Sequence, residues 1–352
     1  MKNSKKSFMH VLSMSILLSL SSTSFAELVI NPSSGSVGQA SMNWSSEEAS
    51  QLLNSDVSSL VEEVSPQGSA KVTTTVRSSN GVPSYSAPKT VRIIDTSAGY
   101  SSQPSVSARA ALVMDAQTGE VLYSKNTNAA LPIASITKLM TAVVIADARL
   151  DMSEEITLQS VDFAGAGGKN SSSTLRAGDS MNRAEALLFA LMKSENPAAA
   201  ALARTYPGGR SAFISAMNAK ARALGMSSTH YVESTGLDPH NVASARDLGI
   251  LVSTASQYGL IRQFSTTASY DFNLGYRMLK SNNTNALVRN GGWNINLSKT
   301  GYINEAGRCV VMHTTLNSRP AVVVILGAST SQSRTEDATR LMTWASQLPK
   351  RI

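Results

Sequence analysis

Strand-like apolar runs lie near both ends of one long region of this chain, with helical patterns between them. Residues 110–114 and 121–123 flank a turn-rich connection, which is typical of a β-hairpin. Residues 308–316 and 321–327 form a second pair around the turn at 317–320. Because strands at the two ends of a domain can pair with each other, we expect one antiparallel sheet with an inserted helical lobe. The predicted fold class is α+β, with helices flanking the sheet.

Apolar side chains recur at helical spacing between those strand pairs, and once more after the last strand. A helical lobe packed on a sheet leaves a cleft at their junction, where binding sites are commonly found. The segments with the clearest helical pattern are Leu139–Ala148, Arg183–Lys193, Pro197–Arg204, Ser211–Leu224 and Thr335–Leu348.

The first 26 residues have the features of an export signal. Early lysines precede an apolar run from Phe8 to Leu20, and Ser24-Phe25-Ala26 is typical of a small-residue cleavage site. A membrane anchor is the alternative, but serines interrupt the run and its length is about 13 residues, whereas a spanning helix needs about 20. We therefore predict that residues 1–26 are removed on export to the periplasm, and that the mature chain has no transmembrane segment.

Residues 27–104 are crowded with Ser, Thr, Gly, Pro and Asn, and their apolar islands are short. Such a segment cannot bury enough surface to offset the entropy of ordering its backbone. We predict a largely disordered tether, with one short helix around Glu47 to Val64, followed by a folded domain at residues 105–352.

Composition excludes several classes of function. The formal net charge of +7 includes the lysines of the export signal and is too mild to indicate nucleic-acid binding. Cys309 is the only cysteine and lies in an apolar run, so we expect a buried structural thiol and no disulfide. His230, His240 and His313 stand apart and form no ligand pair, so we expect no metal and no cofactor.

A serine and a lysine three residues apart open the most apolar of the predicted helices. At this spacing Ser135 and Lys138 share one helical face, and the helix N-terminus favours negative charge that develops near the serine. Burial would lower the pKa of the lysine from about 10.4 toward neutrality, so that its amine could take the serine proton. The same pattern at Ser86 and Lys89 is accidental, since Pro88 interrupts it and no apolar face follows.

Ser194-Glu195-Asn196 lies between two predicted helices. Pro197 suits the first position of the second helix, so capping by Asn196 is the simplest explanation of this motif taken alone.

Lys299-Thr300-Gly301 is followed by Tyr302 on a predicted strand at the cleft. The lysine could keep Lys138 neutral by repulsion, the hydroxyl could bind a substrate carbonyl or carboxylate, and the glycine would let a substrate approach the strand closely.

In this order and separation, the three motifs resemble those of the penicillin-binding serine peptidases. The likeness is to the low-molecular-mass D-alanyl-D-alanine carboxypeptidases and endopeptidases, over about residues 105–350. Ala130–Ala134, Thr235–Leu237, Ser244–Leu248 and Asn304–Gly307 also look like that family. The resemblance implies the transpeptidase fold that penicillin-binding proteins share with β-lactamases, with its antiparallel sheet and inserted helical lobe.

The resemblance also implies a role for each motif. Ser135 would attack the D-alanyl carbonyl with Lys138 as base, and Ser194 and Asn196 would relay protons and orient groups. The substrate would be positioned by Lys299, Thr300 and Gly301, and the backbone N–H groups of Ser135 and Tyr302 would form the oxyanion hole. β-Lactam antibiotics would acylate the same serine.

Two features favour cleavage of peptidoglycan cross-links over trimming of terminal residues. The sequence ends just past the last predicted helix, without the extra β-rich domain and anchor of the typical carboxypeptidases. Glu195 stands where those enzymes usually have a small residue. Both points look more like the penicillin-binding protein 7 type of D-alanyl-D-alanine endopeptidase, although the long tether departs from the compact start of that group.

Several alternatives remain open on the sequence. A D-alanyl-D-alanine carboxypeptidase that trims pentapeptide stems would share every motif, and a non-catalytic wall-binding protein could keep the fold. A Ser-His-Asp hydrolase would need glycines on both sides of the nucleophile, which Ser135 lacks. A β-lactamase would need a deacylating glutamate between the second and third motifs, and no Glu-x-x-Leu-Asn segment is found there.

Overall fold

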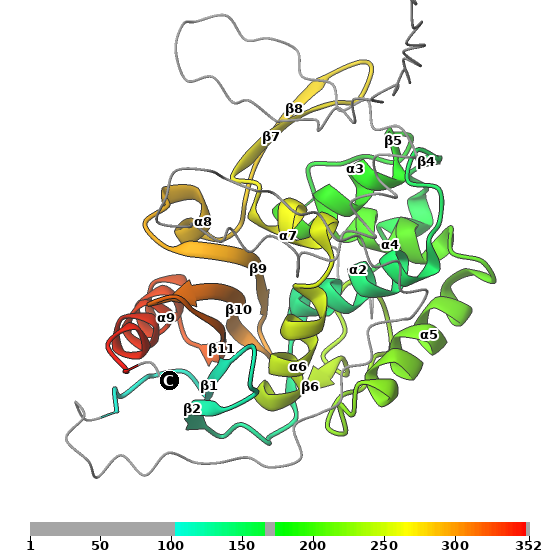
Figure 1. Ribbon diagram of the computed structural model, residues 1–352. Coiled ribbons are helices and arrows are strands. Elements are labelled where there is room, and N and C mark those ends of the chain that lie inside the picture. The colour runs from blue at the N-terminus through cyan, green and yellow to red at the C-terminus, as the bar shows by residue number, and fades with distance from the viewer. Residues whose placement is uncertain (1–102, 166–172, 350–352) are drawn as a thin grey trace, which may run out of the picture. The chain divides into compact units, whose positions relative to one another are not determined.

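The computed structural model describes residues 103–165 and 173–349. In Figure 1 these residues form a sheet beside a lobe of helices. The predicted export signal and nearly all of the predicted tether, including its short helix, lie outside the described residues. No helix in the described part of the chain is both long and apolar enough to cross a bilayer.

The central sheet has five antiparallel strands in the order β2-β1-β11-β10-β9. It therefore joins the first hairpin to the last strands, as the sequence predicts. The pairing of β1 with β11 sets Leu112 opposite Val324, so strands from the two ends of the domain lie side by side. The strands are β1 (Ala110–Asp115), β2 (Val121–Lys125), β9 (Asn294–Ile303), β10 (Gly307–Leu316) and β11 (Arg319–Ala328).

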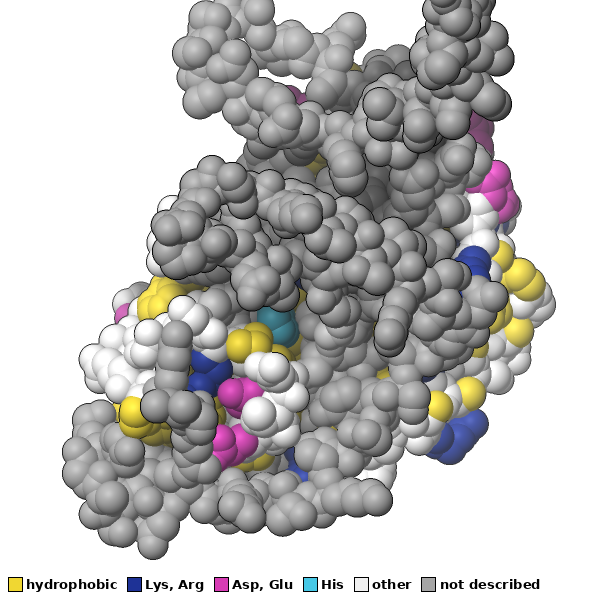
Figure 2. Space-filling model, in the orientation of Figure 1, with side chains coloured by type: hydrophobic (Ala, Val, Ile, Leu, Met, Phe, Trp, Pro, Cys, Tyr) yellow, Lys and Arg dark blue, Asp and Glu magenta, His cyan; other side chains and the backbone are white. Residues whose placement is uncertain are grey.

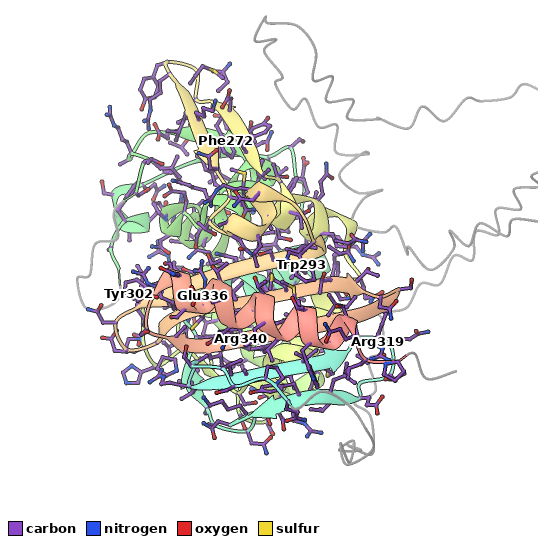
Figure 3. All side chains as sticks on the ribbon, turned by 90° about the vertical axis from the view of Figure 1, so that its left-hand side faces the viewer. Phe272, Trp293, Tyr302, Arg319, Glu336 and Arg340 are labelled. Atoms are coloured by element: carbon purple, nitrogen blue, oxygen red, sulfur yellow. The ribbon has the colours of Figure 1, made fainter. Side chains whose placement is uncertain are left out.

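Both faces of this sheet are buried, which explains why β1 and β11 lack the alternation of a half-exposed strand. Leu112 and Val324 point into the core shared with the helical lobe, whereas Val113 and Val323 point into a second core under α9 (Ser331–Ser346). Figure 3 shows α9, which carries Glu336 and Arg340, lying over one face of the sheet. This helix begins four residues before the predicted start, because Thr330 caps it by accepting from the N–H of Ser333 at 2.9 Å.

The helical lobe surrounds α2 (Thr137–Ala148), which is apolar on all sides and has ten of its twelve residues buried. The predicted segment 183–193 is α3 (Arg183–Leu188) continued by a π-helical turn, Phe189–Lys193. The remaining helices are α4 (Asn196–Arg204), α5 (Gly209–Ala223), α6 (Ala245–Ala255), α7 (Gly259–Thr266) and the short α8 (Ala286–Asn290). Three helices, α6, α7 and α8, are not among the predicted segments, although Ser244 caps α6.

Three small antiparallel hairpins or ribbons complete the described fold. The first matters for the site, because it holds the segment before β6 beside the segment that leads into α2. The pairs are β3 (Leu131–Pro132) with β6 (Val242–Ala243), β4 (Glu155–Thr157) with β5 (Ser180–Asn182), and β7 (Ser269–Asn273) with β8 (Met278–Asn282).

The surface in the orientation of Figure 1 carries a mixed set of charges. Figure 2 shows Lys and Arg side chains scattered among acidic, polar and apolar ones on the part of this face that belongs to described residues. They are not gathered there into one basic patch.

The start of the described chain is fastened to the domain by a carboxylate of α9. Asp337 is buried and accepts hydrogen bonds from the Ser107 N–H at 2.9 Å, the Ser107 hydroxyl at 2.8 Å and the Ala108 N–H at 2.9 Å. Backbone donors bonded to a charged acceptor are costly to leave unpaired.

We expect Asp337→Ala to lower the free energy of unfolding by about 3 kcal/mol, since buried donors would lose their acceptor. Urea denaturation followed by circular dichroism measures the change. Glu336→Gln is the matched control, because its side chain is exposed one position away. Equal stability of the two variants would contradict the anchoring role of Asp337.

Candidate active site

The predicted serine and lysine lie in hydrogen-bonding contact at the start of α2. Ser135 belongs to a 3₁₀ turn, Ala134–Ile136, that continues directly into the helix. Lys138 Nζ lies 3.0 Å from Ser135 Oγ, and the lysine side chain is fully buried. An alcohol and an amine are thus held at the distance that a proton transfer requires.

The amine of Lys138 has two further acceptors besides the serine. Its Nζ lies 2.6 Å from Asn196 Oδ1 and 2.7 Å from the carbonyl oxygen of Thr235. Burial lowers the pKa of Lys138 to about 7, while the carboxylates of Glu233 and then Glu195 act in the opposite direction. Both the charged and the neutral amine are therefore populated near neutral pH.

The second motif contributes both of its polar ends to the site. Ser194 has φ 65° and ends the π-helical turn, and its Oγ accepts from Lys299 Nζ at 2.8 Å. The capping explanation for Asn196 is wrong: Asn196 is the first residue of α4, and the cap position is taken by Glu195, which makes no side-chain capping bond. The Asn196 side chain is used instead to accept from Lys138.

Glu195 turns away from Lys138 Nζ toward a neighbouring loop. Its carboxylate accepts from the hydroxyls of Ser173 at 2.5 Å and Thr174 at 2.7 Å. Ser173 and Asn196 also line a second, smaller cavity of about 230 Å³ on this side of the site. The glutamate that distinguishes this motif thus fastens the wall of that cavity.

The third motif lies on β9, the edge strand of the sheet, which is why its free edge can face Ser135. Lys299 is buried, and its pKa is well below the usual range because of burial, then repulsion by Lys138 and by Arg334. The Thr300 hydroxyl lies 2.7 Å from that of Thr284.

A glycine is required at position 301 because β9 passes very close to the turn that carries Ser135. A Cβ at this position would lie 2.9 Å from the carbonyl oxygen of Ile133 and 3.1 Å from the backbone nitrogen of Ser135. The next residue, Tyr302, keeps its side chain 46% exposed at the cleft. The backbone nitrogen atoms of Ser135 and Tyr302 therefore belong to two segments in close contact.

A cleft of about 640 Å³ opens over these groups. It brings together five of the predicted residues, Ser135, Ser194, Thr300, Gly301 and Tyr302. Lys138 and Lys299 do not line it but donate to Ser135 and Ser194, which do, and Asn196 accepts from Lys138 behind them. Figure 3 shows Tyr302 and Glu336 near the same end of α9, and both line the cleft. The other lining residues are Thr284, Ala286, Arg289, Arg308, Ser331, Gln332, Arg334 and Thr335.

Sequence reasoning missed the arginines of this cleft. Arg289, Arg308 and Arg334 come from α8, β10 and α9, so no local spacing connects them. Guanidinium groups pair well with carboxylates, and the cleft is therefore suited to an anionic substrate.

Sequence reasoning also missed a polar network behind the catalytic pair. The Glu233 carboxylate accepts from the Thr235 N–H at 2.6 Å, from the Gly236 N–H at 2.5 Å and from the Asn241 side-chain amide at 2.7 Å. This fixes the turn whose carbonyl, that of Thr235, accepts from Lys138. The only local signal was the Thr-Gly-Leu segment already noted as part of the family likeness.

No group of three or more His, Cys, Asp and Glu side chains that could hold a metal ion occurs within residues 103–165 and 173–349.

Gly236 packs directly against the backbone that precedes the serine. It has φ +86°, and a Cβ would lie 1.9 Å from the carbonyl oxygen of Ala134. We expect Gly236→Ala to lower the free energy of unfolding by about 3 kcal/mol or more and to slow acylation of Ser135, since the added carbon must push the turn aside.

Gly225→Ala provides the matched control for this variant. Gly225 also has positive φ, but a Cβ there would meet nothing within 4 Å, so only the conformational cost of about 1 kcal/mol is expected. Thermal unfolding and the rate of labelling by a fluorescent penicillin give the two readouts. Equal losses in the two variants would show that the close contact with Ala134 is unimportant.

Comparison with known proteins identifies sequences that are similar to this chain. A model of the D-alanyl-D-alanine carboxypeptidase family matches residues 97–330. A D-alanyl-D-alanine endopeptidase of Pseudomonas aeruginosa is 47% identical over 254 residues, which cover 70% of this chain and 80% of that protein. A D-alanyl-D-alanine endopeptidase of Escherichia coli is 45% identical over 248 residues, covering 69% and 78%.

Solved structures give the same picture of the fold. The DD-transpeptidase of Streptomyces K15 matches with a TM-score of 0.65 and 27% identity, over 70% of this chain and 100% of that one. A D-alanyl-D-alanine carboxypeptidase of Mycobacterium tuberculosis matches with a TM-score of 0.65 and 26% identity, over 72% and 96%. The sheet with its inserted helical lobe is therefore the fold of these peptidases.

Proposed function

Because this chain belongs to the D-alanyl-D-alanine carboxypeptidase family of serine peptidases, we propose that it is a D-alanyl-D-alanine endopeptidase that hydrolyses peptide cross-links of peptidoglycan. The observation that carries this proposal is the 3.0 Å contact between the buried amine of Lys138 and the hydroxyl of Ser135, which opens onto the cleft. The two relatives that are 47% and 45% identical are named as endopeptidases, which favours cross-links over terminal residues as the substrate.

The first half of the reaction forms an ester on the serine. Ser135 Oγ attacks the D-alanyl carbonyl carbon, and its proton passes to the neutral amine of Lys138. The carbonyl oxygen becomes an oxyanion, which the backbone N–H groups of Ser135 and Tyr302 stabilise. Collapse of this species breaks the C–N bond, and the proton held by Lys138 passes through the hydroxyl of Ser194 to the departing amine, which leaves Lys138 neutral.

The second half releases the product by hydrolysis. Water attacks the ester carbonyl, gives a proton to the Lys138 amine and displaces Ser135 Oγ, which regains its proton. A β-lactam ring opens in the same way, with its nitrogen as the leaving group that stays attached. We therefore propose that β-lactams acylate Ser135.

An anionic substrate sets the protonation of the two lysines. The carboxylate next to the scissile bond binds Thr300 and Arg334, with the Lys299 amine behind them. A negative charge there favours the charged form of Lys299, and the charged Lys299 in turn disfavours a proton on Lys138. Substrate binding thus favours the neutral amine that accepts the serine proton.

We also propose that the enzyme works in the periplasm. Residues 1–26 have the charge, apolar run and cleavage site of an export signal. Residues 27–104 then act as a tether for the domain that follows, and peptidoglycan is the partner that the domain meets.

Digestion of purified peptidoglycan fragments tests the proposed activity. We expect the enzyme to convert cross-linked dimers to monomers, and Ser135→Ala to lower this rate at least about 10⁴-fold and to abolish penicillin labelling. Loss of only the terminal alanine from pentapeptides would favour the carboxypeptidase alternative. Full activity of the Ser135→Ala variant would exclude Ser135 as nucleophile.

The pH dependence of acylation tests the base. Because only neutral Lys138 can accept the proton, the acylation rate should fall about tenfold per pH unit below the pKa of about 7 and level off above it. Stopped-flow acylation by a chromogenic cephalosporin measures the midpoint. A rate that is independent of pH from 5 to 8 would contradict the assignment of Lys138.

Glu233→Gln provides a directional test of the same midpoint. The Glu233 carboxylate favours the charged form of Lys138, so its neutralisation should lower the pKa of Lys138 and move the midpoint to lower pH by about one unit. Asp238→Asn, in the same loop, removes a carboxylate that is bonded to His240 and should leave the midpoint in place. A midpoint that moves equally in both variants would argue against a local effect of Glu233.

A further inference from the structure

The cleft carries more positive charge than one substrate carboxylate needs. Arg289, Arg308 and Arg334 all line it. The pKa of Arg334 is lowered by burial and then by the positive charge of Arg308, with a smaller contribution from Arg289. These guanidinium groups are therefore close enough to repel one another.

Acidic partners for these cations are missing from the part of the chain that the structure describes. No ion pair joins Arg289, Arg308 or Arg334 to a described Asp or Glu. Glu336 is the acidic residue of the cleft lining, and it accepts a hydrogen bond from Gln332.

Burial makes this arrangement expensive without an anion. Arg334 is only 7% exposed, and a buried guanidinium cannot escape its charge by losing a proton. Its remaining exposure is toward the cleft that it lines. Arg334 is thus suited to bind the carboxylate next to the scissile bond. Arg308 and Arg289 then still lack an anionic partner among the described residues.

Arg308 is held in a defined orientation at the cleft. It lies opposite Tyr302 on the neighbouring strand, and its guanidinium carbon is 3.4 Å from the centroid of the Tyr302 ring. Stacking on the ring fixes the guanidinium plane and leaves its edges free to donate. Such an edge forms two parallel hydrogen bonds with a carboxylate.

The two candidate substrates differ in the number of carboxylates on the leaving group. A pentapeptide stem loses free D-alanine, which carries one carboxylate. A cross-link loses an amine that belongs to a second stem peptide, and this peptide has further carboxylates beyond the one next to the scissile bond. We infer that Arg308, with Arg289, binds a second carboxylate on the departing peptide and so selects cross-links over pentapeptide stems.

This inference rests on the proposed function, and one set of substrates tests both. The substrates are a cross-linked dimer, the same dimer with the further carboxylates of its departing stem amidated, and a monomeric pentapeptide. We expect Arg308→Gln to lower the ratio of kcat/KM for the dimer to that for the pentapeptide by about ten- to a hundredfold, as for loss of a charge-assisted pair. Arg308→Lys should lose most of this selectivity, because an ammonium neither stacks nor donates in parallel.

The amidated dimer separates recognition of the carboxylate from a general defect. The wild-type enzyme should cleave it about as slowly as Arg308→Gln cleaves the native dimer, and Arg308→Gln should cause no further loss on it. Arg340→Gln is the control, since Arg340 is an exposed arginine of α9 outside the cleft lining. Thermal unfolding and penicillin acylation verify that each variant is folded.

The outcomes distinguish the two proposals. If the wild-type enzyme does not cleave the dimer, the proposed function fails and the inference falls with it. If the wild-type enzyme cleaves the dimer but Arg308→Gln lowers both activities equally, or neither, the second carboxylate site is overturned while the endopeptidase activity stands. Undiminished cleavage of the amidated dimer would overturn it as well.

Discussion

Burial of one amine determines what the rest of this structure must provide. An ammonium group that is fully removed from water costs several kcal/mol unless acceptors replace its hydration. Lys138 has three such acceptors, on Ser135, Asn196 and Thr235. The apolar surroundings of α2 keep water away from the Lys138 amine. The three acceptors offset the cost of this burial, so the side chain stays in place. The balance gives an amine that is half neutral near pH 7, which is what a base for an alcohol requires.

The acceptors themselves are positioned by a second layer of polar contacts. Glu233 gathers the Thr235 and Gly236 N–H groups, and the buried Asn241 side chain joins Glu233 to the hydroxyl of Thr137 on α2. This chain of hydrogen bonds connects the loop before β6 to the helix that carries the lysine. Because each buried donor already has an acceptor, displacement of any one member leaves another unpaired. The distance between the Lys138 amine and the Ser135 hydroxyl is therefore set by the fold and not by the rotamers of the two side chains alone.

The sequence predicted the groups that share a local pattern and missed those that the fold brings together. The spacing of Ser135 and Lys138 is set within one helical turn, so it was readable without a structure. Asn196 was misjudged because a residue before a helical proline suits a cap, and its actual partner is 58 positions away. Arg308 reaches the cleft only through the tertiary structure. The hydrogen bonds of Glu233 are local, but the turn that they hold meets Lys138 only because the chain brings positions 97 apart together. The predicted export signal and tether stay predictions, since almost all of them lies outside the described residues.

The electrostatics of the cleft are asymmetric in a way that suits its proposed chemistry. Lys138 is influenced by two carboxylates, those of Glu233 and Glu195, whereas Lys299 is influenced by the positive charges of Lys138 and Arg334. The Lys138 amine is present in both forms near pH 7, and its charged form cannot accept the serine proton. A carboxylate placed beside Lys299 favours the charged form of Lys299, and the charged Lys299 then disfavours a proton on Lys138. In the proposed mechanism the substrate therefore supplies a charge that raises the neutral fraction of Lys138, whereas a neutral peptide would leave that fraction unchanged.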